Sequence, residues 1–156
     1  MLSEKFLDII KRIYCKLEGS DINWVITGST AFAIQGIPFT PHDIDIQTDK
    51  AGAYAFEKHF EEFVKENVHE SSNGKITSHF GKLEIDGVRV EIMGDMQKLV
   101  DGKWEDPTDL KKYKKFVDFS GMKLPVLDLD YESKAYQKMG RTEKARILKE
   151  WSEKNK

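Results

Sequence analysis

Two aspartates at alternating positions are the residues of this sequence best suited to chemistry. Asp43 and Asp45 lie in a segment where acidic and apolar side chains alternate, Asp43-Ile44-Asp45-Ile46. In a β-strand, alternate side chains project to the same face, so both carboxylates are expected on one side and both isoleucines on the other. Mg²⁺ is usually held by one or two carboxylates together with substrate phosphates. We therefore predict a divalent-cation site at these aspartates.

A phosphate-binding bend is expected a short distance before the aspartates. Gly28 and Ser29 separate an apolar strand at 24–27 from a short helix over about 30–35. A glycine at the start of a helix lets backbone N–H groups approach an anion, and the helix N-terminus favours negative charge. A phosphate cradle followed by a cation site suits a metal-dependent phosphoryl or nucleotidyl transfer. A plain strand-to-helix turn is the alternative interpretation of Gly28.

Together these residues resemble the signature of the nucleotidyltransferase superfamily, the polymerase-beta-like fold. That signature is an apolar residue, Gly, then Gly or Ser, a spacer, and finally Asp-apolar-Asp/Glu-apolar. Here Thr27, Gly28 and Ser29 begin it and residues 43–46 end it. Thr27 departs from the apolar position. The resemblance implies a nucleotidyltransferase fold, which is an α/β (α+β) fold with a mixed sheet and helices packed mainly on one face.

The resemblance also implies a third carboxylate on a later strand, between apolar neighbours. Glu91, between Val90 and Ile92, fits this description. The dipeptide Asp86-Gly87 is a strong hairpin turn, and the register that it sets places Glu91 on the face opposite to its apolar neighbours. Glu91 can join the two aspartates only if their strands are neighbours in one sheet.

The end of the chain is similar to the closing segment of small antibiotic nucleotidyltransferases of the aminoglycoside and lincosamide type, and of minimal nucleotidyltransferases. A final helix is expected over about 131–154, with a break near Gly140. In many of these relatives a basic residue of this helix reaches the nucleotide phosphates, and Lys134, Lys138 and Arg141 are the candidates here. An exposed basic helix face is the alternative interpretation.

The resemblance implies transfer of a nucleoside monophosphate from an NTP, with ATP as the favoured donor, to a hydroxyl of a small molecule or protein. Asp43 and Asp45 would hold one or two Mg²⁺ ions, and Gly28 with Ser29 would bind the terminal phosphates. Glu91 would bind the second ion or accept the proton of the hydroxyl. Two alternatives are an antitoxin-type minimal nucleotidyltransferase acting on a partner toxin, and a non-catalytic nucleotide-binding module.

Composition narrows the partners and the compartment. Lys and Arg number 25 against 27 Asp and Glu, a formal net charge of -2, so no basic field favours nucleic acid. No apolar run approaches the ~20 residues needed to cross a bilayer, and the first 17 residues lack the pattern of a signal peptide. The single cysteine, Cys15, fits a reducing compartment, and we expect a cytoplasmic protein. A protein partner or a homodimer is left open.

The chain length of 156 residues predicts one domain. Periodicity predicts helices over 3–17, 51–66 and 131–154, and strands over 76–84, 88–93, 116–119 and 122–124. Phe63 and Val64 are placed on the apolar stripe of the second helix. The chain is expected to leave the sheet at Gly94-Asp95.

Overall fold

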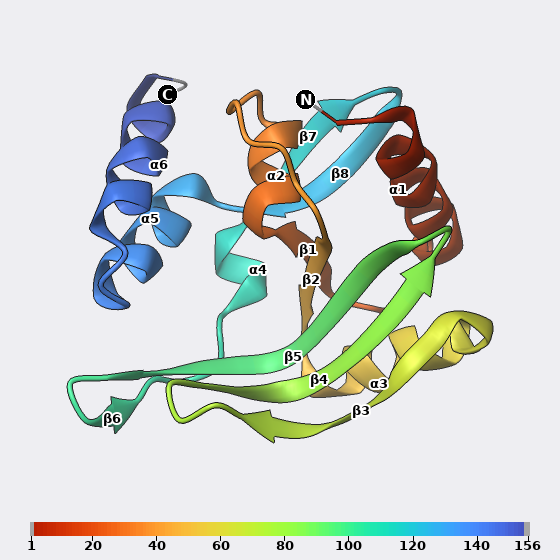
Figure 1. The fold of residues 1–156 in the computed structure, drawn as a ribbon, viewed down its shortest axis with the longest axis horizontal. Helices are drawn as coiled ribbons and strands as arrows, with labels where there is room; N and C mark the ends of the chain where they lie inside the picture. Colours follow the sequence, from red (N-terminus) through yellow and green to blue (C-terminus); the bar gives the residue numbers. More distant parts are fainter. Residues whose placement is uncertain (1, 155–156) are drawn as a thin grey trace.

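The computed structural model describes residues 2–154 of the chain (Figure 1). Its helices are α1 (Glu4–Leu17), α2 (Gly28–Ile34), α3 (Lys50–His59), α4 (Leu110–Tyr113), α5 (Leu129–Lys138) and α6 (Thr142–Lys154), with a 3-10 turn at Glu61–Phe63. Its strands are β1 (Trp24–Thr27), β2 (Ile44–Thr48), β3 (Val64–Ser72), β4 (Ile76–Ile85), β5 (Val88–Val100), β6 (Lys103–Trp104), β7 (Lys114–Phe119) and β8 (Met122–Leu127). Within this part of the chain, no helix is both long enough and apolar enough to span a membrane.

The strands form one mixed sheet in the order β3-β4-β5-β2-β1-β8-β7, and β6 pairs with the far end of β5. The β1–β2 pair is antiparallel, and β2 and β1 pair in parallel with β5 and β8 respectively. The Asp86-Gly87 turn joins β4 to β5 with Lys82 opposite Glu91, as predicted. The hairpin between β7 and β8 is also confirmed. The mixed α/β architecture is therefore the predicted one.

Side-chain alternation gives the two faces of the central strands different surroundings. Ile44 and Ile46 of β2 are fully buried in the main core, to which α1 and α3 contribute. Val25 of β1 and Leu127 of β8 belong to a separate cluster with α4. Asp45 lies between the two isoleucines, so its side chain projects away from the main core. The apolar pattern of β2 thus determines which face carries the acid.

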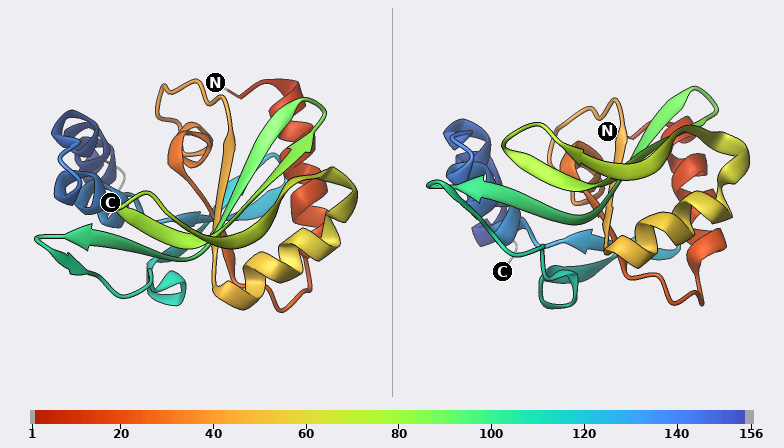
Figure 2. Two further views of the ribbon diagram at one scale, coloured as in Figure 1. Left: turned by 60° about the horizontal axis from the view of Figure 1, so that its bottom comes forward. Right: turned by 90° about the horizontal axis from the view of Figure 1, so that it is seen from below.

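The last two helices pack against α2 instead of extending the sheet. Phe32 of α2, Leu129 of α5 and Leu148 of α6 share a buried cluster. Figure 2 shows α5 and α6 side by side at one end of the molecule, on the same side as the distal ends of β4 and β5. The helical pair is therefore held next to the end of the sheet by α2.

The predicted second helix over 51–66 was wrong at its C-terminal end. The helix α3 ends at His59, and Phe63 and Val64 belong to the 3-10 turn and to β3. β3 is an edge strand with mostly polar side chains, and Val68 is its buried residue. Because such a strand carries no apolar alternation, its sequence gives no period-2 signal.

The chain does not leave the sheet at Gly94-Asp95, which corrects another expectation. β5 continues to Val100. A Cβ atom at Gly94 would lie 2.7 Å from the carbonyl oxygen of Asp49 and 2.8 Å from the Cβ of Ala53. This glycine therefore allows α3 to pack closely on the strand, and it does not end the strand.

The C-terminal helix predicted over 131–154, with a break near Gly140, is two helices, α5 and α6. Gly140, with φ of +80°, follows the end of α5 in the left-handed conformation that ends many helices. The N–H of Gly140 donates to Gln137 O at 3.1 Å, and the N–H of Arg141 donates to Tyr136 O at 2.8 Å. This pair of bonds is a Schellman motif. It turns the chain so that α6 packs back on α5 and Arg141 lies at the corner.

Candidate active site

Three neighbouring strands place Thr27, Asp45 and Glu91 in one row across the sheet. Thr27 of β1 is the register partner of Asp45 of β2, and Asp45 is the register partner of Glu91 of β5. Side chains of directly paired residues project to the same face about 5 Å apart. The structure thus brings together two acids that are 46 positions apart in the sequence. Asp43 lies just before β2, in the turn that leads into the strand.

The carboxyl group of Asp45 has an unusual electrostatic environment. Burial, followed by the negative charges of Glu91 and Asp43 and a hydrogen bond with the Glu91 carboxyl, raises the pKa of Asp45 to about 7. The positive charge of Lys144 opposes this shift in pKa. Like charges raise a carboxyl pKa because they disfavour the ionised form. A divalent cation between these acids would remove that penalty.

These acids fit a Mg²⁺ ion that shares its coordination with a substrate. Among residues 2–154, no three His, Cys, Asp or Glu side chains are already arranged as a metal-binding group. Mg²⁺ rarely uses such a cage, because it takes one or two carboxylates, several waters and substrate phosphates. Asp45 with Asp43 or Glu91 supplies that smaller set of hard oxygen ligands. The guanidinium group of Arg89 lies 3.6 Å from the Glu91 carboxylate, so one positive charge lies beside these acids.

Gly28 lies directly against Asp45 at the start of α2. Its φ of +69° is in the left-handed region, and a Cβ atom there would lie 2.7 Å from Asp45 Oδ2. Glycine is therefore required both by the backbone and by the contact. Ser29 follows on the first turn of α2, and Thr30 Oγ1 donates to Asp43 O at 2.7 Å. This bond joins α2 to the segment that presents the aspartates.

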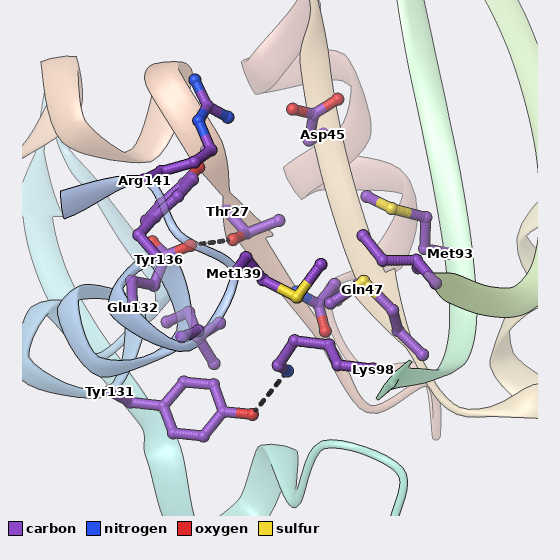
Figure 3. A pocket seen from close by; sticks show the side chains of 15 residues that line it. Thr27, Asp45, Gln47, Met93, Lys98, Tyr131, Glu132, Tyr136, Met139 and Arg141 are labelled. Carbon is purple, nitrogen blue, oxygen red and sulfur yellow. Dashed lines mark hydrogen bonds between the residues drawn. The ribbon is translucent and has the colours of Figure 1, made fainter. Parts of the chain in front are cut away.

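A cleft runs from Gly28 and Asp45 to the distal part of β5, between the sheet and α5 (Figure 3). Its lining also includes Thr27, Gln47, Ile76, Met93, Met96, Lys98, Leu127, Tyr131, Glu132, Ala135, Tyr136, Met139 and Arg141. Asp45 and Arg141 lie at one end of it, and Lys98 and Tyr131 lie at the other. Asp45 therefore lies at one end of an elongated, largely apolar groove.

The three basic residues predicted to reach the phosphates have different positions. Arg141 lines the cleft, with its guanidinium group 5.2 Å from the ring centroid of Tyr136. Lys134 is exposed and pairs with Asp130 at 3.0 Å, and Lys138 pairs with Glu105 at 2.8 Å. Both lysines border a neighbouring cavity and not the cleft that holds Asp45. The structure therefore brings Arg141 alone of the three to the end of the cleft at which Asp45 lies.

The sequence profile of the aminoglycoside-2''-adenylyltransferases matches residues 9–151, which is nearly the whole chain. The chain belongs to this family. A search of curated protein sequences finds no match.

Solved structures agree with the family assignment. TM1012 of Thermotoga maritima, solved as the structure of a proposed nucleotidyltransferase, shares 54% sequence identity over 99% of this chain and 96% of its own, with a TM-score of 0.87. ANT(2'')-Ia in complex with adenylyl-2''-tobramycin shares 12% identity over 92% and 87% of the two chains, with a TM-score of 0.60. The lincomycin-bound lincosamide adenylyltransferase LnuA shares 14% over 95% and 97%, with a TM-score of 0.59. The fold is thus the nucleotidyltransferase fold, and as an aminoglycoside-2''-adenylyltransferase family member the protein is a nucleotidyltransferase.

Sequence reasoning missed Glu132, a buried acid of this family member. Glu132 is 5% exposed, and its Oε1 accepts a hydrogen bond from Thr27 Oγ1. It also accepts a bond from the N–H of Gly28, the backbone group that the sequence assigned to a phosphate. Glu132 Oε2 is buried without a hydrogen-bond partner. Burial is the main reason why the pKa of Glu132 rises to about 8.

A signal for Glu132 does exist in the sequence. It lies three residues after Leu129 and four before Tyr136, which is the spacing of the inward stripe of a helix. An acid on such a stripe is a candidate for a buried functional group. Thr27, the departure from the superfamily signature, is the residue that meets this acid.

Lys144 of α6 is the second residue that the sequence did not identify. Its Nζ lies 4.9 Å from the ring centroid of Tyr136 and 5.6 Å from that of Phe32. Its positive charge acts favourably on both Asp45 and Glu132. Burial, opposed by these acids, lowers the pKa of Lys144. No local pattern marks this lysine, because its aromatic neighbours come from α2 and α5.

Proposed function

We propose that the protein transfers the AMP group of ATP to a hydroxyl group of a small molecule, with Mg²⁺ as cofactor and pyrophosphate as product. Membership of an adenylyltransferase family supports ATP as the donor. The observation that carries the proposal is the register of β1, β2 and β5, which aligns Thr27, Asp45 and Glu91 beside Gly28. This arrangement combines acids able to bind a metal with a glycine that leaves room for the Asp45 carboxylate at the start of α2.

Asp43 and Asp45 would hold the Mg²⁺ ion, with the substrate phosphates completing its coordination. When bound, the ion neutralises phosphate charge and stabilises the leaving pyrophosphate. The backbone after Gly28 and the Ser29 hydroxyl would bind the terminal phosphates. Arg141, at the same end of the cleft, would add a charge-assisted hydrogen bond. Lys134 and Lys138 stay predictions made from the resemblance.

Glu91 would accept the proton of the acceptor hydroxyl. The hydroxyl oxygen then forms a bond to the α-phosphorus, the bond between that phosphorus and the bridging oxygen breaks, and pyrophosphate leaves. Glu91 is suited to this role because its side chain is 23% exposed and is next to Asp45. Holding the hydroxyl and the phosphorus in line supplies much of the rate in such displacements.

A small-molecule acceptor is favoured over a protein acceptor. ANT(2'')-Ia and LnuA were solved with adenylyl-2''-tobramycin and lincomycin, and both share this fold. The elongated cleft of this chain offers a comparable site for a small molecule. The family therefore gives no support to the antitoxin-type alternative or to a module without turnover.

The test is transfer of label from α-³²P-ATP with Mg²⁺ and a panel of hydroxyl compounds. We expect labelled product and pyrophosphate from the wild type, and a loss of at least about 10³-fold for Asp45→Asn, because the metal and its charge stabilisation are lost. Asp118→Asn, a matched change at an exposed position of β7, should leave transfer unchanged. Transfer that survives Asp45→Asn would falsify the metal role.

A further inference from the structure

Lys98 is a buried lysine at the end of the cleft opposite to Asp45, and it also borders the neighbouring cavity that Asp128 and Asp130 line. Only 4% of it is exposed, although lysine is rarely buried without a charged partner. Its Nζ donates to Tyr131 Oη at 3.2 Å and lies 5.3 Å from the Tyr131 ring centroid. Within residues 2–154, no carboxylate lies within 4.0 Å of this nitrogen. A buried ammonium group held only by a phenol oxygen is costly unless an anion joins it.

The phosphates of the nucleotide are too far away to be that anion. Lys98 follows Glu91 by seven positions on β5, which corresponds to about 20 Å of strand. Phosphates bound to a cation at Asp45 gather around that cation. Figure 3 shows Asp45 and the amine of Lys98 at opposite ends of the cleft. The group that meets Lys98 therefore belongs to another part of the bound substrates.

The walls around Lys98 are apolar and deformable. The thioethers of Met93, Met96 and Met139 line this end, and Gln47, which is 4% exposed, adds a buried amide. Methionine side chains adapt to irregular flat or aliphatic bodies. The inner end of the cleft thus combines an apolar surface with one cation and one amide.

We propose that this inner end is the acceptor subsite, and that it takes a hydroxyl compound with an apolar body and an anionic oxygen, such as a carboxylate or sulfonate, that pairs with Lys98. The role of this compound as the acceptor rests on the proposed function, whereas its binding beside Lys98 does not. The family name suggests a polycationic acceptor, and the charges of this cleft oppose one.

A polycation would meet a positive charge at each end of the groove. Lys98 and Arg141 line the two ends, and Asp45 is engaged with the cation site. The other acid of the lining, Glu132, already accepts bonds from Thr27 and Gly28. Like charges within a desolvated site disfavour binding strongly. We therefore expect aminoglycosides to be poor acceptors.

Two fluorescent probes with one body test the proposal directly. 1-Anilinonaphthalene-8-sulfonate carries the anion, and N-phenyl-1-naphthylamine is its neutral analogue. We expect the wild type to bind the sulfonate at least tenfold more tightly than the neutral probe. Lys98→Met should lose at least tenfold in sulfonate affinity and keep its affinity for the neutral probe, which also shows that the cleft is intact. Lys98→Arg should retain the preference for the sulfonate.

The matched control is Lys149→Met, because Lys149 lies at an exposed position of α6 and lines neither cavity that Lys98 borders. It should change neither affinity. Equal affinity of the wild type for the two probes overturns the proposal without any variant, so a failure of Lys98→Met to fold leaves it testable. Unchanged sulfonate binding by a folded Lys98→Met protein overturns it as well.

Three further results separate this proposal from the proposed function. Asp45→Asn should bind the sulfonate normally even though it transfers no AMP. A non-hydrolysable ATP analogue with Mg²⁺ should not displace the probe, and displacement would assign the subsite to the nucleobase instead of the acceptor. Transfer of AMP to tobramycin by the wild type would also overturn the proposal.

Discussion

The Asp45 carboxylate lies so close to Gly28 that a single methyl group at residue 28 would come within 2.7 Å of Oδ2. The two residues come from different elements, and their contact sets the spacing between Asp45 and the bend that we propose to bind phosphate. Under the proposed function, that spacing has to match the reach of a triphosphate bound to a cation.

We expect Gly28→Ala to lower AMP transfer by about 10²-fold, because a displacement of the Asp45 carboxylate by an ångström misaligns the reacting groups. The left-handed backbone at Gly28 adds a loss of about 1 kcal/mol in the free energy of unfolding. Steady-state transfer rates and urea denaturation measure the two effects. Gly74→Ala is the control, because Gly74 has φ of +86° and open space around it. If both variants lose activity equally, the contact with Asp45 does not matter.

Binding of Mg²⁺ should strengthen as the pH rises from 6 to 8. The pKa of Asp45 is raised to about 7, so below pH 7 the ion has to displace a proton. The affinity should change by up to about tenfold per pH unit below the pKa. Calorimetric titration of Mg²⁺ at pH 6 and pH 8 measures this change. An affinity that is independent of pH would show that Asp45 is ionised throughout.

Replacing Lys144 should shift the pH dependence of Mg²⁺ binding to higher pH. Lys144 lowers the pKa of Asp45 through its positive charge, so Lys144→Met leaves the carboxyl harder to ionise. The midpoint of Mg²⁺ binding against pH should therefore rise. Lys149→Met, on the exposed side of α6, is the control and should keep the wild-type midpoint. A downward shift in Lys144→Met would contradict the electrostatic role of Lys144.

Glu132 should make the protein less stable as the pH rises. The pKa of Glu132 is about 8 in the folded protein against an ordinary value of 4.5, so the folded state retains a proton that the unfolded chain has lost. The contribution of Glu132 to the free energy of unfolding is therefore fully present below pH 4.5. It falls as the pH rises towards 8, by up to about 1.4 kcal/mol per pH unit. Burial of Asp45 adds a contribution of the same sign up to about pH 7.

Urea denaturation at pH 5, 6.5 and 8 measures this dependence. Glu132→Gln should flatten it, because the amide keeps an acceptor for Thr27 and carries no titrating proton. Glu153→Gln, at an exposed position of α6, should leave the wild-type slope. A steep slope retained by Glu132→Gln would assign the effect to other groups.

Arg141 and Lys134 should differ in their effects on ATP. Arg141→Gln is expected to raise the KM for ATP about tenfold, because a charged hydrogen bond to phosphate is worth roughly 1.5 to 3 kcal/mol. Lys134→Gln should leave the KM unchanged, since Lys134 pairs with Asp130 away from the cleft. Steady-state kinetics at saturating acceptor give both values. An equal rise in both variants would support the prediction made from the resemblance, in which either residue reaches the phosphates.

Local rules were sufficient for the acids and for the hairpin that presents Glu91. Alternation with period 2 places Asp45 opposite to Ile44 and Ile46, and the two residues of the Asp86-Gly87 turn set the register of β4 and β5. Both rules involve neighbours within a few positions, so the sequence alone determined the face on which each acid lies. The mixed α/β class was predicted as well, through the resemblance of residues 27–46 to the nucleotidyltransferase signature.

Only the tertiary structure decided which of these faces meet. The pairing of β2 with β5 joins Asp45 to Glu91, and the packing of α5 and α6 on α2 brings Glu132 and Lys144 to the same place. The cost of burying a charge depends on its final surroundings, and those come from segments far apart in the chain. For the same reason Lys98 reads as an ordinary polar residue of β5 until the folded cleft shows that it is buried.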